Sequence, residues 1–175
     1  MKKFKLTSEF IVDISGVKLF RIKALIEFGN VKAGDLGGYI EKEENLSHMG
    51  DAWVSDDARI SGNAQVFGNA QVFGNARVSG DARVSGNARV SGDAQVFGDA
   101  RVSGDKDYAY AHGFGSCNRT TTFFRLKDGD VGVRCGCFYG TLAQFRDNVC
   151  ETHGETKKAQ EYLMLADLMD FRFKN

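Results

Sequence analysis

One short segment concentrates side chains that could bind a small anion. Residues 115–122 read GSCNRTTT, and Lys127 follows at the end of the same predicted strand. A guanidinium forms forked hydrogen bonds with a phosphate or carboxylate, and hydroxyls and amides complete such a shell. The alternative is a Thr-rich strand whose hydroxyls bond across a sheet. The predicted ligand-binding residues are Ser116, Asn118, Arg119, Thr120, Thr121, Thr122 and Lys127.

Cysteine spacing in the last third of the chain gives a weak zinc hypothesis. Cys135 and Cys137 lie two residues apart, so on a strand they face one side. With Cys117 and either His112 or His153 they would supply three sulfurs and one nitrogen. A C-x-C pair without a second paired motif is more typical of small, reduced cysteines. We therefore predict no metal and no other cofactor.

A six-residue repeat fills the middle of the chain and must position these residues. From Ala58 the copies read ARISGN, AQVFGN, AQVFGN, ARVSGD, ARVSGN, ARVSGD, AQVFGD and ARVSGD, and a degenerate copy begins at Ala52. Ala and Val lie two apart and share one face of an extended segment, while the Arg or Gln between them faces outward. Gly followed by Asn or Asp suits a tight corner. Such copies bury their apolar side only by stacking, which predicts a parallel β-solenoid.

Stacking every third copy aligns the outward residues in columns. The predicted columns are Arg59, Arg77 and Gln95; Gln65, Arg83 and Arg101; and Gln71 and Arg89. Between residues 51 and 105 there are five arginines against seven aspartates. The surface is therefore predicted to be a balanced, solvated face, and no nucleic-acid partner is expected.

Three aromatic residues depart from the outward pattern. Phe67, Phe73 and Phe97 take the place that Ser holds in most other copies. Exposed aromatics on a small solenoid are expected to be covered by another segment or subunit. We therefore predict that these residues form an oligomer interface.

The segment before the repeat, residues 1–50, is predicted to be a β-rich cap. Its expected strands are Phe4–Leu6, Phe10–Ile14 and Val17–Ile26, with a hairpin turn at Ser15 and Gly16. Gly37 and Gly38 then indicate either an anion cradle or, as we favour, a chain reversal into the first coil. A cap is expected because an open solenoid end exposes unpaired strand edges.

The segment after the repeat, residues 106–175, is predicted to be a ββαα unit. Its strands are Arg119–Leu126 and Val131–Cys137, and its helices run from Thr141 to Thr152 and from Thr156 to Phe171. The chain is thus divided into a cap at 1–50, a solenoid at 51–105 and a recognition unit at 106–175.

Composition excludes several classes of protein. The net charge is zero, with 23 basic and 23 acidic residues, so no polyanion partner is indicated. No apolar run approaches the ~18 residues of a membrane span, and MKKFKLTSEF lacks the apolar core of a secretory signal. Four cysteines without framework-like spacing indicate a reducing compartment, and we predict a cytoplasmic protein.

The repeat resembles the left-handed β-helix of the hexapeptide-repeat superfamily. That family places a small residue four positions after an aliphatic one, as in Val66 to Ala70 and Val84 to Ala88. Three copies form one coil in the family, so nine copies imply about three coils. The resemblance also implies packing of flat solenoid faces around a threefold axis, and therefore a homotrimer.

Over nearly its full length the chain resembles hexapeptide-repeat proteins that occur widely in bacteriophages and prophages. The resemblance rests on GDLGGYIEKEENLS, on the VSGNA and VFGDA copies, and on GSCNRTTTFFRLKDG and CGCFYGTLAQF. It implies a non-enzymatic binding or scaffold protein in the host cytoplasm. Such a protein could antagonise host defence by binding a defence protein or by sequestering a nucleotide signal.

Two other functions stay open. Hexapeptide acyltransferases share the solenoid and use a His as general base, and His112, just past the last copy, is the candidate here. The repeat departs from that family because it contains neither a His nor an insertion loop. The second alternative is a structural virion component.

Overall fold

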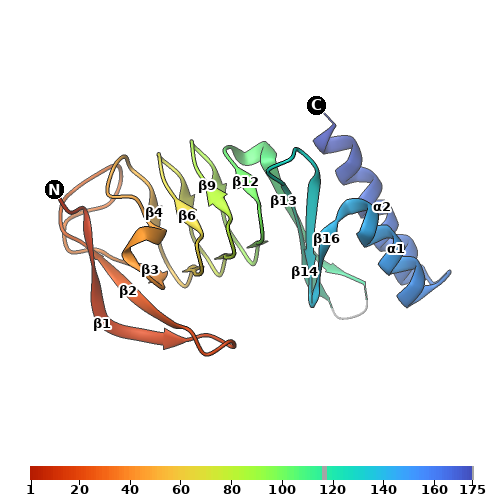
Figure 1. Ribbon diagram of the computed structural model, residues 1–175, viewed down its shortest axis with the longest axis horizontal. Helices are drawn as coiled ribbons and strands as arrows, with labels where there is room; N and C mark the ends of the chain where they lie inside the picture. Colours follow the sequence, from red (N-terminus) through yellow and green to blue (C-terminus); the bar gives the residue numbers. More distant parts are fainter. Residues whose placement is uncertain (116–117, 175) are drawn as a thin grey trace.

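The computed structural model describes residues 1–115 and 118–174. The molecule is elongated: a β-hairpin lies at the N-terminal end, stacked coils follow, and a sheet with two helices lies at the other end (Figure 1). The side chains that could bind a ligand are therefore positioned by three parts of the molecule: the two terminal units and the central stack.

The elements follow one another in three groups. The first is β1 (Phe4–Val12), β2 (Lys18–Ala24), β3 (Leu36–Ile40) and the 3-10 helix η1 (Glu43–Asn45). The stacked strands are β4 (Trp53–Val54), β5 (Arg59–Ile60), β6 (Gln65–Val66), β7 (Gln71–Val72), β8 (Arg77–Val78), β9 (Arg83–Val84), β10 (Arg89–Val90), β11 (Gln95–Val96) and β12 (Arg101–Val102). The last group is η2 (Asp105–Asp107), β13 (Tyr108–Phe114), β14 (Arg119–Arg125), β15 (Val131–Cys135), β16 (Phe138–Thr141), α1 (Leu142–His153) and α2 (Lys157–Phe173).

The repeat forms a β-solenoid, as predicted. Two-residue strands recur every six residues and join three parallel sheets, in which each strand pairs with the strand three copies away. The side chains of the Ala and Val ladders point into the stack and are buried there. From Gly62 to Gly98 a glycine turns each corner with positive φ, for example 73° at Gly80, where a Cβ would lie 2.9 Å from Gly98 N. The predicted columns of outward residues are confirmed by the strand register.

The solenoid has about four turns, so the expected count of three is wrong. β3 pairs in parallel with β5, and Leu46 forms a bridge with Val66, so an earlier coil precedes the first recognisable copy. Neither segment carries the six-residue motif, which is why the sequence pattern does not reveal it. Gly37 and Gly38 lie within β3 rather than in a chain reversal, and a Cβ on Gly38 would lie 2.7 Å from the Ala58 carbonyl oxygen.

The N-terminal hairpin continues one solenoid sheet. β1 and β2 pair antiparallel through the predicted turn at Ser15 and Gly16, and β2 pairs antiparallel with β3. The resulting six-stranded sheet has the order β1-β2-β3-β5-β8-β11. We call its solenoid part (β3, β5, β8 and β11) the first face.

Lys3 closes the N-terminal end of the stack. Its side chain is buried, and Nζ donates hydrogen bonds to the carbonyl oxygens of Gly50 at 3.1 Å and Ala52 at 2.7 Å. The ammonium also lies 4.6 Å from the centroid of the Phe28 ring. Burial lowers the pKa of Lys3 to about 8, although Asp51 opposes the shift.

The C-terminal unit is a four-stranded antiparallel sheet with two helices, so the expected pair of strands is incomplete. The sheet order is β13-β14-β15-β16, and both predicted helices are present, with Thr141 and Thr156 as N-caps. β13 reads YAYAHGF and β16 is only four residues long, so neither has the β-branched pattern that marks a strand. No helix within the described ranges has both the length and the apolar character of a membrane span.

This sheet docks on the last coil of the solenoid. The Gln95 backbone amide donates to Thr122 Oγ1 at 2.9 Å, and Ala100 forms an antiparallel bridge with Leu126. The Phe97 and Tyr139 rings meet edge to face, with centroids 5.0 Å apart. Side chains of the C-terminal sheet are therefore brought beside the end of the first face.

Candidate anion-binding groove

One row of outward side chains crosses the first face and both flanking units. Consecutive cross-strand neighbours in this row are Arg21, Tyr39, Arg59, Arg77 and Gln95. The row continues into the C-terminal sheet, where Thr122, Arg134 and Tyr139 are neighbours in turn. Strand pairing therefore sets the order of the charged, amide and aromatic groups along the molecule.

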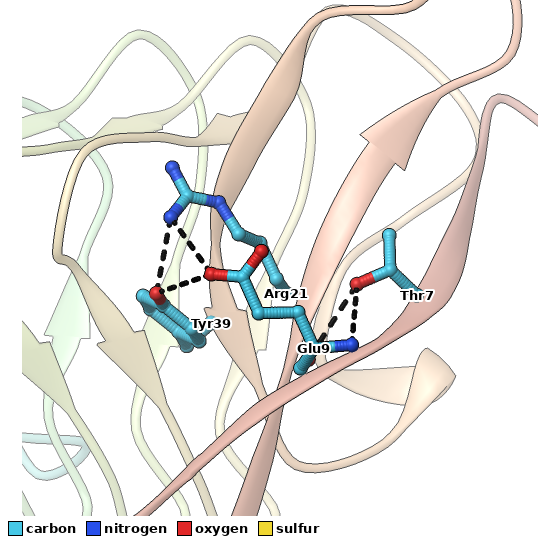
Figure 2. Close-up of polar contacts among 4 residues, drawn as sticks. All are labelled: Thr7, Glu9, Arg21 and Tyr39. Atoms are coloured by element: carbon cyan, nitrogen blue, oxygen red, sulfur yellow. Dashed lines mark hydrogen bonds and ion pairs between the residues drawn. The ribbon is translucent and has the colours of Figure 1, made fainter.

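At the N-terminal end of the row, arginine charge is already paired (Figure 2). Arg21 Nη1 donates to Glu9 Oε1 at 3.2 Å and to the Tyr39 hydroxyl at 3.0 Å, and that hydroxyl donates to the same Glu9 oxygen at 3.2 Å. Thr7 Oγ1 accepts a hydrogen bond from the Glu9 backbone amide at 3.2 Å, and this bond helps to hold Glu9 in place on β1. We call Glu9, Arg21 and Tyr39 the Arg21 cluster. Burial acts to lower the pKa of Arg21, but its bonds to Glu9 and Tyr39 raise the pKa above its usual value.

Two strands further along, the arginines lack such partners. The guanidinium groups of Arg59 and Arg77 form no hydrogen bond or ion pair with any residue that the structure describes. They are direct neighbours on β5 and β8, strands that lie ~4.8 Å apart in a parallel sheet. Like charges in this position repel each other. We call Arg59 and Arg77 the arginine column.

The arginine column faces a groove of about 500 Å³. The β1–β2 turn, Asp13 to Val17, forms one side, and Arg134 of the C-terminal sheet lies at the far end. The Ser61 and Ser79 hydroxyls line the solenoid corner next to the column, and Phe97 continues that corner. We call this hollow the arginine groove.

Both carboxylates in the groove lining are occupied by the protein itself. Asp13 Oδ1 accepts from the Ser15 hydroxyl at 2.7 Å and from the amides of Ser15 and Val17, each at 2.9 Å. These bonds, with a smaller contribution from Arg59, hold the pKa of Asp13 below its ordinary value. Glu41 Oε2 accepts from the Gly62 amide at 2.6 Å. The acidic groups therefore hold the groove walls together, while the guanidinium groups stay available to a ligand.

The C-terminal end of the groove presents planar groups that contact one another. Arg134 Cζ lies 5.1 Å from the centroid of the Phe97 ring, and Tyr139 meets the same ring edge to face. Phe97 is thus covered by its own chain, by the C-terminal sheet.

The three phenylalanines predicted to form an interface do not gather in one place. Phe67 follows β6, Phe73 follows β7 and Phe97 follows β11, so each lies at a different corner of the coil. Phe73 is half-buried with Arg89 Cζ at 5.6 Å, whereas Phe67 is exposed. No single flat face can include all three.

The threonines of the predicted ligand segment bond inside the protein. Thr120 Oγ1 lies 3.0 Å from His112 Nδ1, Thr121 Oγ1 donates to Cys135 Sγ at 3.2 Å, and Thr122 Oγ1 accepts from the Gln95 amide. All three side chains are buried. This arrangement favours the alternative interpretation, a Thr-rich strand that holds sheets together.

The remaining residues of that segment are separated. Ser116 lies outside the described residues, as does Cys117, and Asn118 is exposed. Arg119 lines a cavity of about 160 Å³ with Cys135 and His153. Lys127, beyond the opposite end of β14, lines a hollow of about 340 Å³ with Arg83 and Arg101. The structure therefore does not bring Arg119 and Lys127 to one ligand.

The groups considered for zinc do not form a cluster in the described part of the chain. No three His, Cys, Asp or Glu side chains come together there in a way that could hold a metal ion. Cys135 is half-buried against Thr121, and Cys137 is exposed.

The sequence predicted one part of the groove, the column of Arg59 and Arg77, but did not indicate that this column could bind a ligand. The stacking of Arg59 on Arg77 follows from the repeat, but the balanced total charge gave no sign that these two guanidinium groups form no ion pair with any described residue. The contribution of Arg134 depends on how the C-terminal sheet docks, and the repeat pattern carries no signal for that docking.

Comparison with known protein families supports the solenoid. Four overlapping segments, residues 64–80, 70–85, 82–95 and 94–105, match the family model described as the YdcK beta solenoid repeat. No curated protein matches the chain. Over these repeats, the chain is similar to proteins built on a β-solenoid of this kind.

Proposed function

We propose that this protein is a non-enzymatic binding protein whose arginine groove takes up a small, phosphate-bearing anion. The observation that carries the proposal is the arginine column: two adjacent guanidinium groups face a groove of about 500 Å³, and neither forms a hydrogen bond or ion pair with a described residue. An anion bound across them would offset their mutual repulsion and form charge-assisted hydrogen bonds.

The solenoid suits this task because it fixes the backbone positions of the two arginines before any ligand arrives. The Arg59 amide donates to the Ala76 carbonyl and the Arg77 amide to the Ala94 carbonyl, each at 2.9 Å, so both residues are held in continuous ladders. A preorganised site loses less conformational entropy on binding. The Ser61 and Ser79 hydroxyls lie at the adjacent corner and can complete the coordination of a phosphate.

A binding role is preferred to catalysis because the titratable groups near the proposed anion site are poorly placed to act as general bases. Asp13 and Glu41 are each bonded to backbone amides and are poorly available as general bases. His112, the base that an acyltransferase would need, is exposed on β13 and is not part of the groove lining. Acyl transfer and a structural virion role have no such supporting geometry in the described residues.

The proposal also includes the handedness of the coil, the origin of the protein and its place of action. We propose a left-handed coil of the hexapeptide-repeat kind, a phage-type origin and action in the host cytoplasm, all on the sequence resemblance. Among the suggested ways of opposing host defence, sequestration of a small signal suits the arginine groove better than blocking a defence protein.

We also propose that the protein is a homo-oligomer, with a trimer as the expected state. A further exposed apolar stripe on α2, formed by Met164, Leu168 and Phe171, offers an alternative contact to the solenoid corners. Native mass spectrometry would give the subunit number. Loss of the oligomer in Phe67→Ser but not in Leu168→Gln would support association through the solenoid, the reverse would indicate α2, and a monomeric wild-type protein would contradict the proposal.

Anion binding is tested by denaturation in the presence of sodium pyrophosphate, against sodium chloride at the same ionic strength. A ligand at 100 times its dissociation constant stabilises the folded state by about 2.7 kcal/mol. We expect stabilisation of the wild-type protein and none of the double variant Arg59→Gln/Arg77→Gln. Gln is acceptable in these positions because other copies already carry it.

The matched control is Arg83→Gln, the same repeat position on another face. It should respond to pyrophosphate like the wild-type protein. Equal loss of stabilisation in Arg83→Gln would indicate general charge screening, and no stabilisation of the wild-type protein would contradict the proposed function.

A further inference from the structure

We infer that the ligand of the arginine groove is a nucleoside polyphosphate, with its phosphates on Arg59 and Arg77 and its base against Arg134. The inference rests on the proposed function, since it names the class of anion for the same groove. It is carried by the order of groups along the row, which changes from two cations without an ion-paired partner among the described residues to an amide and then to planar groups.

Arg134 is held as a flat surface at the end of the groove. Its guanidinium lies over the Phe97 ring, and its strand is fixed between Thr122 of β14 and Tyr139 of β16. A guanidinium stacked on one aromatic ring still offers its other plane for stacking. Nucleobases stack on arginine and aromatic planes.

Gln95 occupies the position between the cations and this surface. It follows Arg77 in the row, and its backbone is fixed by the bond from its amide to Thr122 Oγ1. Its half-buried side chain lines the groove and carries both a donor and an acceptor. A side-chain amide of this kind can recognise the edge of a base.

The size of the groove agrees with this class of ligand. Its volume of about 500 Å³ lies in the range of small-molecule and cofactor sites, roughly 300–1,000 Å³. Inorganic phosphate or pyrophosphate would cover only the arginine column. A nucleotide would also fill the part of the groove that Gln95, Phe97 and Arg134 line.

The test is isothermal titration calorimetry of the full chain with ADP and with pyrophosphate, without divalent cations and at constant ionic strength. We expect ADP to bind at least tenfold more tightly than pyrophosphate. Equal affinities would overturn the nucleotide inference while leaving the proposed anion site in place. Binding of neither probe would overturn both.

Two variants locate the preference for the base. Arg134→Lys keeps the charge but removes the planar group, and Phe97→Ser removes the supporting ring in favour of the residue found at Ser61 and Ser79. Each should reduce the ratio of ADP affinity to pyrophosphate affinity to about one. An unchanged ratio in both variants, with wild-type secondary structure by circular dichroism, would contradict the assignment of the base to Arg134.

Discussion

Two regions of the same sheet treat arginine in opposite ways. In the Arg21 cluster, the guanidinium is bonded to Glu9 and Tyr39, and its charge is used within the protein. In the arginine column, which begins two strands away in the same row, the guanidinium groups of Arg59 and Arg77 face the groove without an ion-paired partner among the described residues. The residue type and the outward position are the same, so the difference lies in the neighbours.

Under the proposed function, this contrast separates an arginine that stabilises the fold from two arginines that bind a ligand. A paired arginine stabilises the junction between hairpin and solenoid, whereas two neighbouring arginines without ion-paired partners in the described structure repel each other. Such local unfavourable contacts are expected at binding sites, where a ligand supplies the missing partner. Pairing, rather than the number of basic residues, distinguishes the arginine column from the Arg21 cluster.

The largest effect is expected at Lys3, a cation that is fully enclosed by the fold. Its pKa of about 8 lies below the ordinary value of 10.5, so the unfolded state binds more protons between these pH values. The free energy of unfolding should therefore rise as the pH increases from about 8 to 10.5, by up to about 3 kcal/mol at 1.36 kcal/mol per pKa unit. The bonds to Gly50 and Ala52 favour the ammonium and will reduce the rise.

Urea denaturation at several pH values measures this dependence. Lys3→Met should remove the rise, whereas Lys2→Met, which changes an exposed side chain, should keep it. The same pH profile in Lys3→Met and the wild-type protein would show that Lys3 is not the titrating group.

Removal of the paired arginine should cost more stability than removal of an unpaired one. Arg21→Ala leaves the Glu9 carboxylate and the buried Tyr39 hydroxyl without their shared partner. We expect a loss of about 2 kcal/mol, as for other partly buried charged hydrogen bonds, but less than about 0.5 kcal/mol for Arg59→Ala. Chemical denaturation of both variants measures the difference, and equal losses would remove the distinction between the two regions.

An acidic partner beside the arginine column should stabilise the folded state and weaken anion binding. Gln95→Glu places a carboxylate directly beside Arg77, and cross-strand pairs of opposite charge contribute roughly 0.2–1 kcal/mol. The variant should therefore be more stable, while its pyrophosphate affinity should fall at least tenfold, or about 1.4 kcal/mol.

Gln65→Glu is the matched control because Gln65 stands in the same relation to Arg83 on another face. It should gain similar stability and keep the wild-type affinity in calorimetry. Loss of affinity in this control would mean that total charge, and not the groove, governs binding.

The smallest effect is the relief of repulsion in Arg77→Gln. At low ionic strength this substitution should raise the free energy of unfolding by a few tenths of a kcal/mol, roughly the cost of like charges placed opposite each other. At about 1 M salt the Debye length falls to about 3 Å, so the gain should vanish. A gain that is independent of salt would point to packing instead of charge.

The repeat made the solenoid predictable because each copy repeats the same physical requirements. Buried Ala and Val, outward Arg or Gln and a corner glycine determine the strands and their stacking, and the column of Arg59 over Arg77 follows from the period alone. The coil formed by β3 and Leu46 was missed because those residues pair with the repeat without sharing its motif.

The candidate site was predictable only in part. The sequence drew attention to Thr120–Thr122, whose hydroxyls prove to hold the sheets together. The position of Arg134 over Phe97 depends on tertiary docking, and the pairing of Arg21 depends on a hairpin folding back onto the solenoid. Neither contact can be predicted from local sequence patterns.

The contrast between paired and unpaired arginines can be measured directly by NMR of the arginine side chains. Nitrogen-15 spectra of the Nε–H groups, assigned with single Arg→Gln variants, would be recorded during titration with pyrophosphate. The Arg59 and Arg77 signals should shift together and saturate, while those of Arg21 and Arg83 should stay in place. Equal, unsaturated shifts at all four arginines, or none at Arg59 and Arg77, would contradict an anion site at the arginine column.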